Sequence, residues 1–240
     1  MFMDKAEALK SHGGKDRYNW VSDFVYGGID GAVTTFAVVA GVEGASLSTG
    51  IILVLGFANL FADGFSMAVG KYSSDKAEIE EYERIKKLEY QHLKEKPDHE
   101  REEIEEIMKK YGFKGKDLKK AVDIITSDED GWVDMMMRHE FNMTLENIRP
   151  FYGGLATLVS FLLIGFIPLM SYVFRDLIGF DNVFLLTCIL TTFALFIVGA
   201  VKSRFTTRNW LVSGFETAFI GGVAAVIAFY IGLMLKGLVT

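Results

Sequence analysis

Several carboxylates lie inside long apolar stretches of the sequence, where a charge is unexpected. Asp30 lies in the segment GGIDGAVTT, Asp63 in a second apolar stretch and Glu216 in the last one. A carboxylate at the centre of a bilayer costs about 2.5–3.5 kcal/mol on insertion scales, so such residues usually serve a function. We therefore place Asp30, Asp63 and Glu216 on a transport path. The alternative for Asp30 and Asp63 is a neutral acid that only fixes packing, and Glu43 is expected to be structural at the outer interface.

The second apolar stretch brings three possible ligands onto one helix face. Asn59, Asp63 and Met67 are spaced i, i+4 and i+8, so a carboxamide, a carboxylate and a thioether follow one another along that face. A thioether adds nothing for Mg²⁺ or Ca²⁺, but it favours a softer divalent transition metal. The set therefore predicts Fe²⁺ or Mn²⁺ as the substrate, with Zn²⁺ and Co²⁺ as further candidates.

A second group of possible ligands lies in the charged middle of the chain. It consists of three sets at helical spacing: Glu89, His92 and Glu95; Glu103 and Glu106; Met136, Met137 and Glu140. Glutamate-rich helix faces are usually solvated and methionine stripes usually belong to a core, so spacing alone leaves a metal role open. The chain has one cysteine, Cys188, and no tetrahedral Cys/His set, which argues against a closed structural zinc site.

The elements that must position these residues are long apolar helices. Half of the residues are hydrophobic, the mean hydropathy is +0.26, and yet 23% of the residues are charged. A span takes about 20 helical residues. Five stretches are long enough: Phe24–Gly44, Leu47–Val69, Phe151–Phe174, Val183–Val201 and Leu211–Leu235. This pattern excludes a water-soluble enzyme, a disordered chain and a secreted disulfide scaffold.

The charges are concentrated between the second and third stretches. Residues 71–150 hold 16 of the 25 Lys and Arg and 21 of the 31 Asp and Glu. We expect the second span to continue as a helix through Lys71–Lys96, and Pro97 to begin a helix that Gly112 ends. Two more helices are expected at Asp117–Thr126 and Gly131–Ile148. The fold class is thus an all-α membrane protein of five transmembrane helices, with a packed three-helix insert between the second and third.

The distribution of Lys and Arg predicts the orientation of the chain. The N-terminal segment, the insert and the loop with Lys202, Arg204 and Arg208 lie on one side, whereas only Arg175 and Lys236 lie on the other. The side rich in Lys and Arg is usually cytoplasmic. The N-terminus and the insert are therefore expected in the cytoplasm. Residues 1–20 are expected to form a lead-in helix at the membrane surface, because they have no apolar core of a signal peptide.

At this level of detail the sequence resembles the vacuolar iron transporter family. The similarity extends from about Tyr18 to the C-terminus and keeps the order of the motifs. They are GGIDGAVTTFAVVAGVEGA at Gly27–Ala45, ANLFADGFSMAVGKYSSDKAE at Ala58–Glu78, GWVDMMMRHE at Gly131–Glu140, GFIPLMSY at Gly165–Tyr172, VGAVKSRFT at Val198–Thr206 and IGGVAAVIAFYIG at Ile220–Gly232. The resemblance implies a dimeric exchanger of five helices that moves Fe²⁺, often also Mn²⁺, out of the cytoplasm against protons.

The resemblance also implies roles for particular residues. Asp30 and Met67 match the translocation pair of the family. In the insert, Glu103 and Glu106 match its paired acids, with Glu95 upstream, while Met136, Met137 and Glu140 match its last metal-binding helix. Two residues depart from the pattern, since Asn59 stands where some members have an acid and His92 where a glutamate is expected. The first puts in doubt a proton carrier at that position, and the second could retune the insert site, because imidazole is also a good ligand.

Small residues on the first two spans allow either assembly or packing within the chain. Gly27 and Gly31 are spaced i, i+4, as are Gly64 and Ala68, which permits close approach of another helix. The spacing does not distinguish the two possibilities, whereas the resemblance favours a homodimer with the path near its two-fold axis.

Two other classes of function remain to be compared with transport. An enzyme is disfavoured, because the sequence has no HExxH, no P-loop and no Ser/His/Asp arrangement, and it predicts neither a resident cofactor nor a nucleic-acid partner. A membrane-anchored metal sensor would not need acids within its spans. The membrane itself is left open: a plasma membrane in a prokaryote, a vacuolar membrane in a eukaryote.

Overall fold

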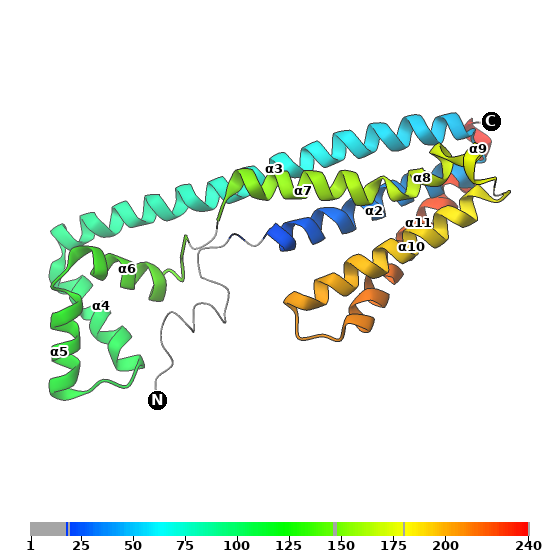
Figure 1. Ribbon diagram of the computed structural model, residues 1–240. Helices are drawn as coiled ribbons and strands as arrows, with labels where there is room; N and C mark the ends of the chain where they lie inside the picture. The colour runs from blue at the N-terminus through cyan, green and yellow to red at the C-terminus, as the bar shows by residue number, and fades with distance from the viewer. Residues whose placement is uncertain (1–17, 19, 146–147, 180, 240) are drawn as a thin grey trace. The chain divides into compact units, whose positions relative to one another are not determined.

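The computed structural model describes residues 18, 20–145, 148–179 and 181–239, and these residues form helices and connecting segments without a strand. The helices are shown in Figure 1. Their bounds are α2 Trp20–Gly44, α3 Thr49–Glu95, α4 Pro97–Lys110, α5 Gly115–Ile125, α6 Glu129–His139, α7 Pro150–Gly165, α8 Ile167–Val173, α9 Arg175–Ile178, α10 Val183–Lys202, the short 3₁₀ helix η1 Ser203–Phe205 and α11 Trp210–Val239. The predicted lead-in helix of residues 1–20 lies outside the described residues except for Tyr18 and Trp20.

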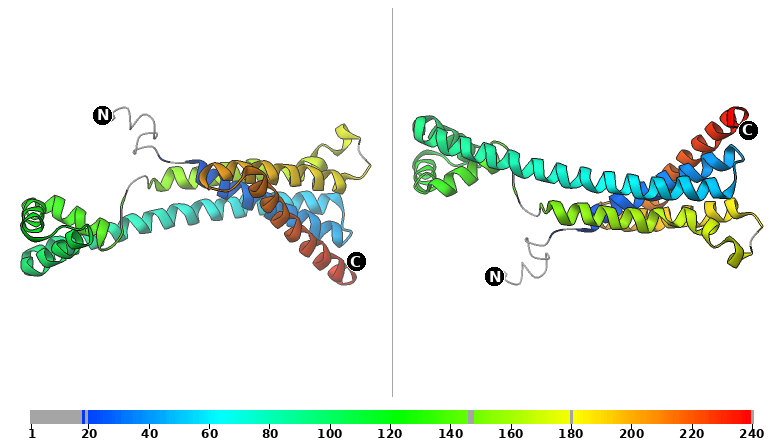
Figure 2. Two further views of the ribbon diagram at one scale, coloured as in Figure 1. Left: turned by 90° about the horizontal axis from the view of Figure 1, so that it is seen from below. Right: turned by 90° about the horizontal axis from the view of Figure 1, so that it is seen from above.

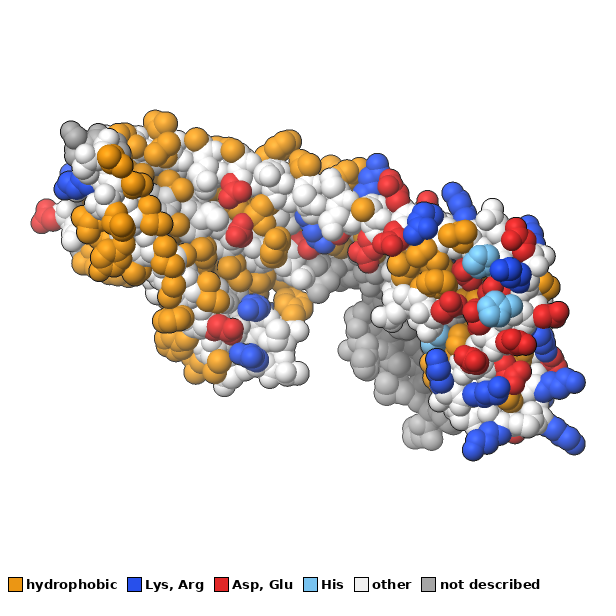
Figure 3. All heavy atoms as spheres, turned by 180° about the vertical axis from the view of Figure 1, so that it is seen from behind, with side chains coloured by type: hydrophobic (Ala, Val, Ile, Leu, Met, Phe, Trp, Pro, Cys, Tyr) orange, Lys and Arg blue, Asp and Glu red, His pale blue; other side chains and the backbone are white. Residues whose placement is uncertain are grey.

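The helices form two compact units. The charged unit comprises Asp75–Ile148, and the apolar unit comprises Tyr18–Ser74 and the residues from Arg149 onward. Helix α3 contributes its first half to the apolar unit and its second half to the charged unit, so its apolar stretch continues into a polar helix as predicted. On the face shown in Figure 3, orange apolar side chains cover much of the apolar unit, and acidic and basic side chains crowd the charged unit.

Four helices of the apolar unit are long and apolar enough to cross a membrane: α2, the first part of α3, α10 and α11. A fifth span is counted if α7 and α8, which are bent by 41° at a short break, act as one. The predicted third stretch, Phe151–Phe174, is thus divided into two helices at this break, and its crossing of the membrane as one span stays a prediction. The reason is local, because Pro168 in the first turn of α8 has no N–H to donate to the carbonyl four residues earlier.

Close packing in the apolar unit explains the small residues of the first two spans. A Cβ atom on Gly27 would lie 2.4 Å from the Ser160 hydroxyl oxygen, and one on Gly31 would lie 2.5 Å from the Phe161 carbonyl oxygen, so α2 and α7 need glycine to touch. A Cβ on Gly64 would lie 3.0 Å from the Phe161 ring. Contacts within the chain thus account for these glycines, and the views in Figure 2 show the helices running side by side in this unit. The homodimer stays a prediction.

The charged unit packs around a core to which the second half of α3 and the helices α4, α5 and α6 all contribute. Ile104, Val133, Met136 and Met137 have no exposed surface and belong to one apolar cluster. Helix α4 begins at Pro97 as expected, with Asp98 and Glu100 in its first turn. Helix α6 begins after Asp128, whose side chain accepts a hydrogen bond from the Gly131 N–H.

One predicted helix of the charged unit is much shorter than expected. Helix α6 ends at His139, whereas the sequence pattern suggested that it would reach Ile148. The chain turns away because Asn142 adopts a left-handed backbone conformation with φ of 53°, and the Met143 N–H donates back to the Met137 carbonyl oxygen. This turn leaves Glu140 and Phe141 at the end of α6.

Candidate metal sites

An acidic pocket lies in the charged unit where α3, α4 and the end of α6 meet. It has a volume of about 180 Å³. Pro97 makes it possible, because α3 ends at Glu95 and α4 starts two residues later, so the last turns of α3 face the first turns of α4. Its lining residues are Glu89, His92, Lys96, His99, Glu100, Glu103, Glu140 and Phe141.

Three residues of this acidic pocket could hold a metal ion together. One ligand atom from each of Glu89, His92 and Glu100 lies within 4.8 Å of the other two. The Nδ1 atom of His92 is 3.4 Å from Oε1 of Glu89 and 3.6 Å from Oε1 of Glu100. Both glutamates are buried, and their Oε2 atoms have no hydrogen-bond partner among the described residues. Buried carboxylates that face one another without such partners are suited to binding a cation.

The electrostatics of the acidic pocket support the same interpretation. Burial and the repulsion of Glu103 and Glu89 raise the pKa of Glu100 to about 7. Burial and the repulsion of Glu103, Glu89 and Glu100 raise the pKa of Glu140 to about 7 as well. The pKa of Glu89 is also raised by burial, although the neighbouring His92 opposes this effect. The pocket therefore holds protons near neutral pH, and a bound cation would displace them.

The structure brings together four of the eight residues predicted for this site. Glu89, His92, Glu103 and Glu140 line the acidic pocket, but Glu95 and Glu106 are exposed and are not among its lining residues. Glu106 follows Glu100 by six residues, which turns it about 120° around the helix axis, away from the acids on the inner face of α4.

The sulfur atoms and one acid depart from the sequence interpretation. Met136 and Met137 are fully buried in the core of the charged unit and are not among the residues that line the acidic pocket. Glu100, which sequence analysis did not select as a ligand, is one of the three residues closest together. Its signal was present in the sequence, since Glu100 and Glu103 are spaced i, i+3 just after Pro97.

The second candidate site lies on α2 and α3 in the apolar unit. Asp30 is half-buried on α2, while Asn59, Asp63 and Met67 are half-buried on α3. Both acids thus lie on helices that are long and apolar enough to cross a membrane. The Nδ2 atom of Asn59 is buried without a hydrogen-bond partner among the described residues, and Met67 packs against the apolar cluster of Val39 and Phe161.

The other two acids of the apolar unit have partners of their own. Glu216 is exposed on α11, and its Oε2 atom lies 3.5 Å from Nη1 of Arg208. Glu43 accepts a hydrogen bond of 2.5 Å from the buried Tyr172 hydroxyl, which agrees with the structural role expected for it. Glu216 thus has an ion-pair partner, whereas none is seen for Asp30 or Asp63 among the described residues.

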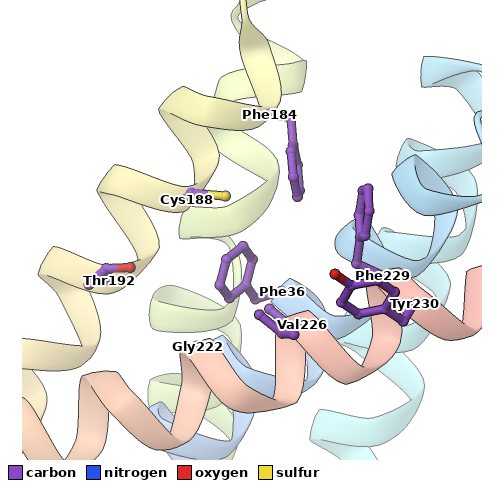
Figure 4. A pocket seen from close by; sticks show the side chains of 9 residues that line it. Phe36, Phe184, Cys188, Thr192, Gly222, Val226, Phe229 and Tyr230 are labelled. Carbon is purple, nitrogen blue, oxygen red and sulfur yellow. The ribbon is translucent and has the colours of Figure 1, made fainter. Parts of the chain in front are cut away.

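An apolar cavity of about 430 Å³ between α2, α10 and α11 is a poor candidate for a metal path. Figure 4 shows aromatic rings and small side chains around it. No Asp or Glu is among its lining residues, which are Phe36, Phe184, Cys188, Thr192, Gly222, Ala225, Val226, Phe229 and Tyr230.

The structure combines apolar helices that carry acids with a separate acidic pocket. These features are typical of helical membrane proteins that handle cations. Comparison with known proteins narrows the class: a profile of the VIT family matches residues 21–233, and the chain belongs to this family. It is 35% identical over 210 residues to vacuolar iron transporter 1 of Arabidopsis thaliana, covering 87% of this chain and 83% of the relative. It is 32% identical over 234 residues to vacuolar iron transporter 1 of Oryza sativa subsp. japonica, covering 95% and 92%.

A third relative extends the comparison beyond plants. The vacuolar iron transporter of Plasmodium berghei (strain Anka) is 32% identical over 220 residues, covering 88% of this chain and 81% of the relative. These proteins are named as transporters, not as enzymes, which agrees with the absence of catalytic motifs from the sequence. The comparisons therefore confirm the family resemblance, and they support an integral membrane protein that transports metal ions.

Proposed function

We propose that this protein exports Fe²⁺, and also Mn²⁺, from the cytoplasm in exchange for protons. The observation that supports it most directly is the triad of Glu89, His92 and Glu100, in a chain with helices long and apolar enough to cross a membrane. The Oε2 atoms of the two glutamates are buried and have no hydrogen-bond partner among the residues that the structure describes. The iron in the names of the relatives makes Fe²⁺ the first substrate to test.

The acids of α2 and α3 suggest how exchange could work. Asp30 on α2 and Asp63 on α3 are carboxylates on two helices of membrane-spanning length. Their charges need compensation, which one divalent ion or protons can supply. Asn59 and Met67 follow on the same face of α3 as Asp63 and add an oxygen and a sulfur donor. Because metal and protons compete for one pair of carboxylates, a cycle that alternates between them exchanges the two ions. Glu216 is left out of this path because of its ion pair with Arg208.

The charged unit collects metal for this path. The charged unit, the N-terminal segment and the loop after α10 together hold far more Lys and Arg than the opposite side, which has only Arg175 and Lys236, and this asymmetry favours a cytoplasmic location for all three. A cluster of carboxylates raises the local concentration of cations and the rate at which they are captured. We further propose a homodimer, as the resemblance implies, in a plasma membrane if the source is prokaryotic and in a vacuolar membrane if it is eukaryotic.

Metal flux in proteoliposomes tests this function. Purified protein should move Fe²⁺ when a pH gradient is imposed, and the flux should be accompanied by opposite movement of protons. Protein with Glu216→Gln serves as a matched control for an acid in the same unit that we place outside the path. Flux that ignores the gradient would contradict exchange, and metal binding without any flux would favour the membrane-anchored sensor instead.

A further inference from the structure

His92 places a ring nitrogen beside the two most buried acids of the acidic pocket. Its Nδ1 atom lies 3.4 Å from Glu89 and 3.6 Å from Glu100, residues that are only 2% and 3% exposed. The Oε2 atoms of both acids are buried and have no hydrogen-bond partner among the described residues. An unpaired buried carboxylate oxygen is costly, so a cation bound beside these two oxygens would stabilise them.

The three ligand atoms are spaced as they would be around one ion. They lie within 4.8 Å of one another, and ligands at about 2.0–2.6 Å from a common ion lie no more than about 5 Å apart. Two donors are carboxylate oxygens and the third is an imidazole nitrogen. Glu103 and Glu140 line the same pocket and supply further negative charge.

We propose that His92 makes this pocket select Fe²⁺, Co²⁺ and Zn²⁺ over Mg²⁺, Ca²⁺ and Mn²⁺. Carboxylate oxygens suit all of these ions and are the preferred ligands of Mg²⁺, Ca²⁺ and Mn²⁺, whereas imidazole nitrogen suits zinc and iron. A pocket of glutamates alone would therefore gather divalent cations with little chemical preference. The inference rests on the proposed function, because it takes the acidic pocket as the place where metal is captured.

A second histidine of the same pocket provides an internal control. The Nε2 atom of His99 lies 3.6 Å from Oε1 of Glu103, but its side chain is 63% exposed, and it is not part of the triad. His99 and His92 thus have the same chemistry and line the same pocket, and only His92 faces the two buried acids.

The test compares the affinities of Co²⁺ and Mn²⁺ in the full-length protein in detergent. All variants also contain Asp30→Asn, which weakens binding by the acids of the spans. Replacing imidazole by carboxylate in His92→Glu should lower the ratio of Co²⁺ affinity to Mn²⁺ affinity by about tenfold, which corresponds to about 1.4 kcal/mol. The visible absorption of bound Co²⁺ should change as well, because a nitrogen ligand is lost. His99→Gln should leave both the ratio and the spectrum as they are.

His92→Gln is a second variant that keeps a neutral side chain of similar length. It should weaken Co²⁺ binding more than Mn²⁺ binding, whereas equal weakening of both ions would show that His92 only shapes the pocket and would overturn the inference. An unchanged affinity ratio in His92→Glu, or an equal change in His99→Gln, would overturn it too. Flux is measured separately, in protein that keeps Asp30. Flux in that protein together with an affinity ratio that does not depend on His92 refutes this inference alone, and a ratio that depends on His92 without flux in that protein refutes only the proposed function.

Discussion

The two units of this protein each bring carboxylates together, but in different surroundings. In the charged unit, Glu89 and Glu100 meet in a pocket formed by the polar end of α3, the start of α4 and the end of α6, and protons can neutralise the acids near neutral pH. In the apolar unit, Asp30 and Asp63 lie half-buried on two helices that are apolar enough to span a membrane. The first arrangement can release its cation to water, while the second lies where only a compensated charge is tolerated.

This difference suggests a division of roles. Acids in the acidic pocket should set how tightly metal is captured, and acids in the spans should decide whether it crosses. The partnered acids of the apolar unit sharpen the contrast, since Glu43 and Glu216 have a hydroxyl and a guanidinium group beside them.

Removing the charge of Asp30 should have the largest effect. Asp30→Asn keeps the side-chain volume but removes an ionised ligand, whose contribution of about 1.5–3 kcal/mol corresponds to roughly a 10- to 150-fold loss of flux. Fe²⁺ uptake into proteoliposomes at saturating metal measures it, with Glu216→Gln as the control. Wild-type flux in folded Asp30→Asn protein would show that the acid pair is not on the path.

Removing acids from the acidic pocket should affect capture more than crossing. The triple variant Glu100→Gln, Glu103→Gln and Glu140→Gln should raise the apparent KM for metal about tenfold, because the local attraction for cations is lost. The maximal rate should change much less. The exposed Glu106 lies on the same helix, so Glu106→Gln is the matched control and should alter neither value. Loss of flux at saturating metal would instead make the charged unit a gate.

The metal-free charged unit should lose stability as the pH rises. Glu100 and Glu140 have a pKa of about 7 in the folded chain, above their ordinary 4.5, chiefly because of burial. The folded state therefore holds protons that the unfolded chain has released, so this stability is complete below about pH 4.5 and is lost as the pH rises through 7.

Hydrogen exchange of α4 and α6 amides, corrected for intrinsic rates, measures this loss between about pH 5 and 8. Co²⁺ added at the upper end should restore protection because it replaces the lost protons. The variant Glu100→Gln should flatten the dependence on pH. Protection that stays constant over this range in metal-free wild type would contradict the assignment of a shared acidic pocket.

The sequence predicted the helices better than the contacts between them. Long apolar runs and Pro97 located the spans and the turn between α3 and α4, because these signals are local. The end of α6 depends on the backbone of Asn142, which few sequence patterns reveal. Glu100 was missed for a related reason, since choosing among the acids of α4 requires knowing which side of the helix faces α3.

The acids within the apolar helices also show what the sequence alone could not reveal. Apolar surroundings drew attention to Asp30, Asp63 and Glu216 alike, although Glu216 is exposed and paired with Arg208 in the structure. Arg208 precedes Glu216 by eight residues and lies outside the helix that holds it, so helical spacing gave no sign of the pair. Such a partner is a property of the fold, so only the structure reveals it.

The smallest effect should come from an acid that already has a partner. Tyr172 donates its hydroxyl proton to Glu43, and the Tyr172 side chain is buried, so Tyr172→Phe leaves a carboxylate oxygen without this bond. The expected cost is about 1–3 kcal/mol of stability, seen as a lower unfolding temperature in detergent. Tyr230→Phe on the exposed face of α11 is the control and should change the unfolding temperature little. Flux should stay close to wild type below the unfolding temperature, because Glu43 stabilises the fold and does not bind the ion. If Tyr172→Phe were as stable as wild type but inactive, Glu43 would belong to the path, and the distinction between partnered and unpartnered acids would fail.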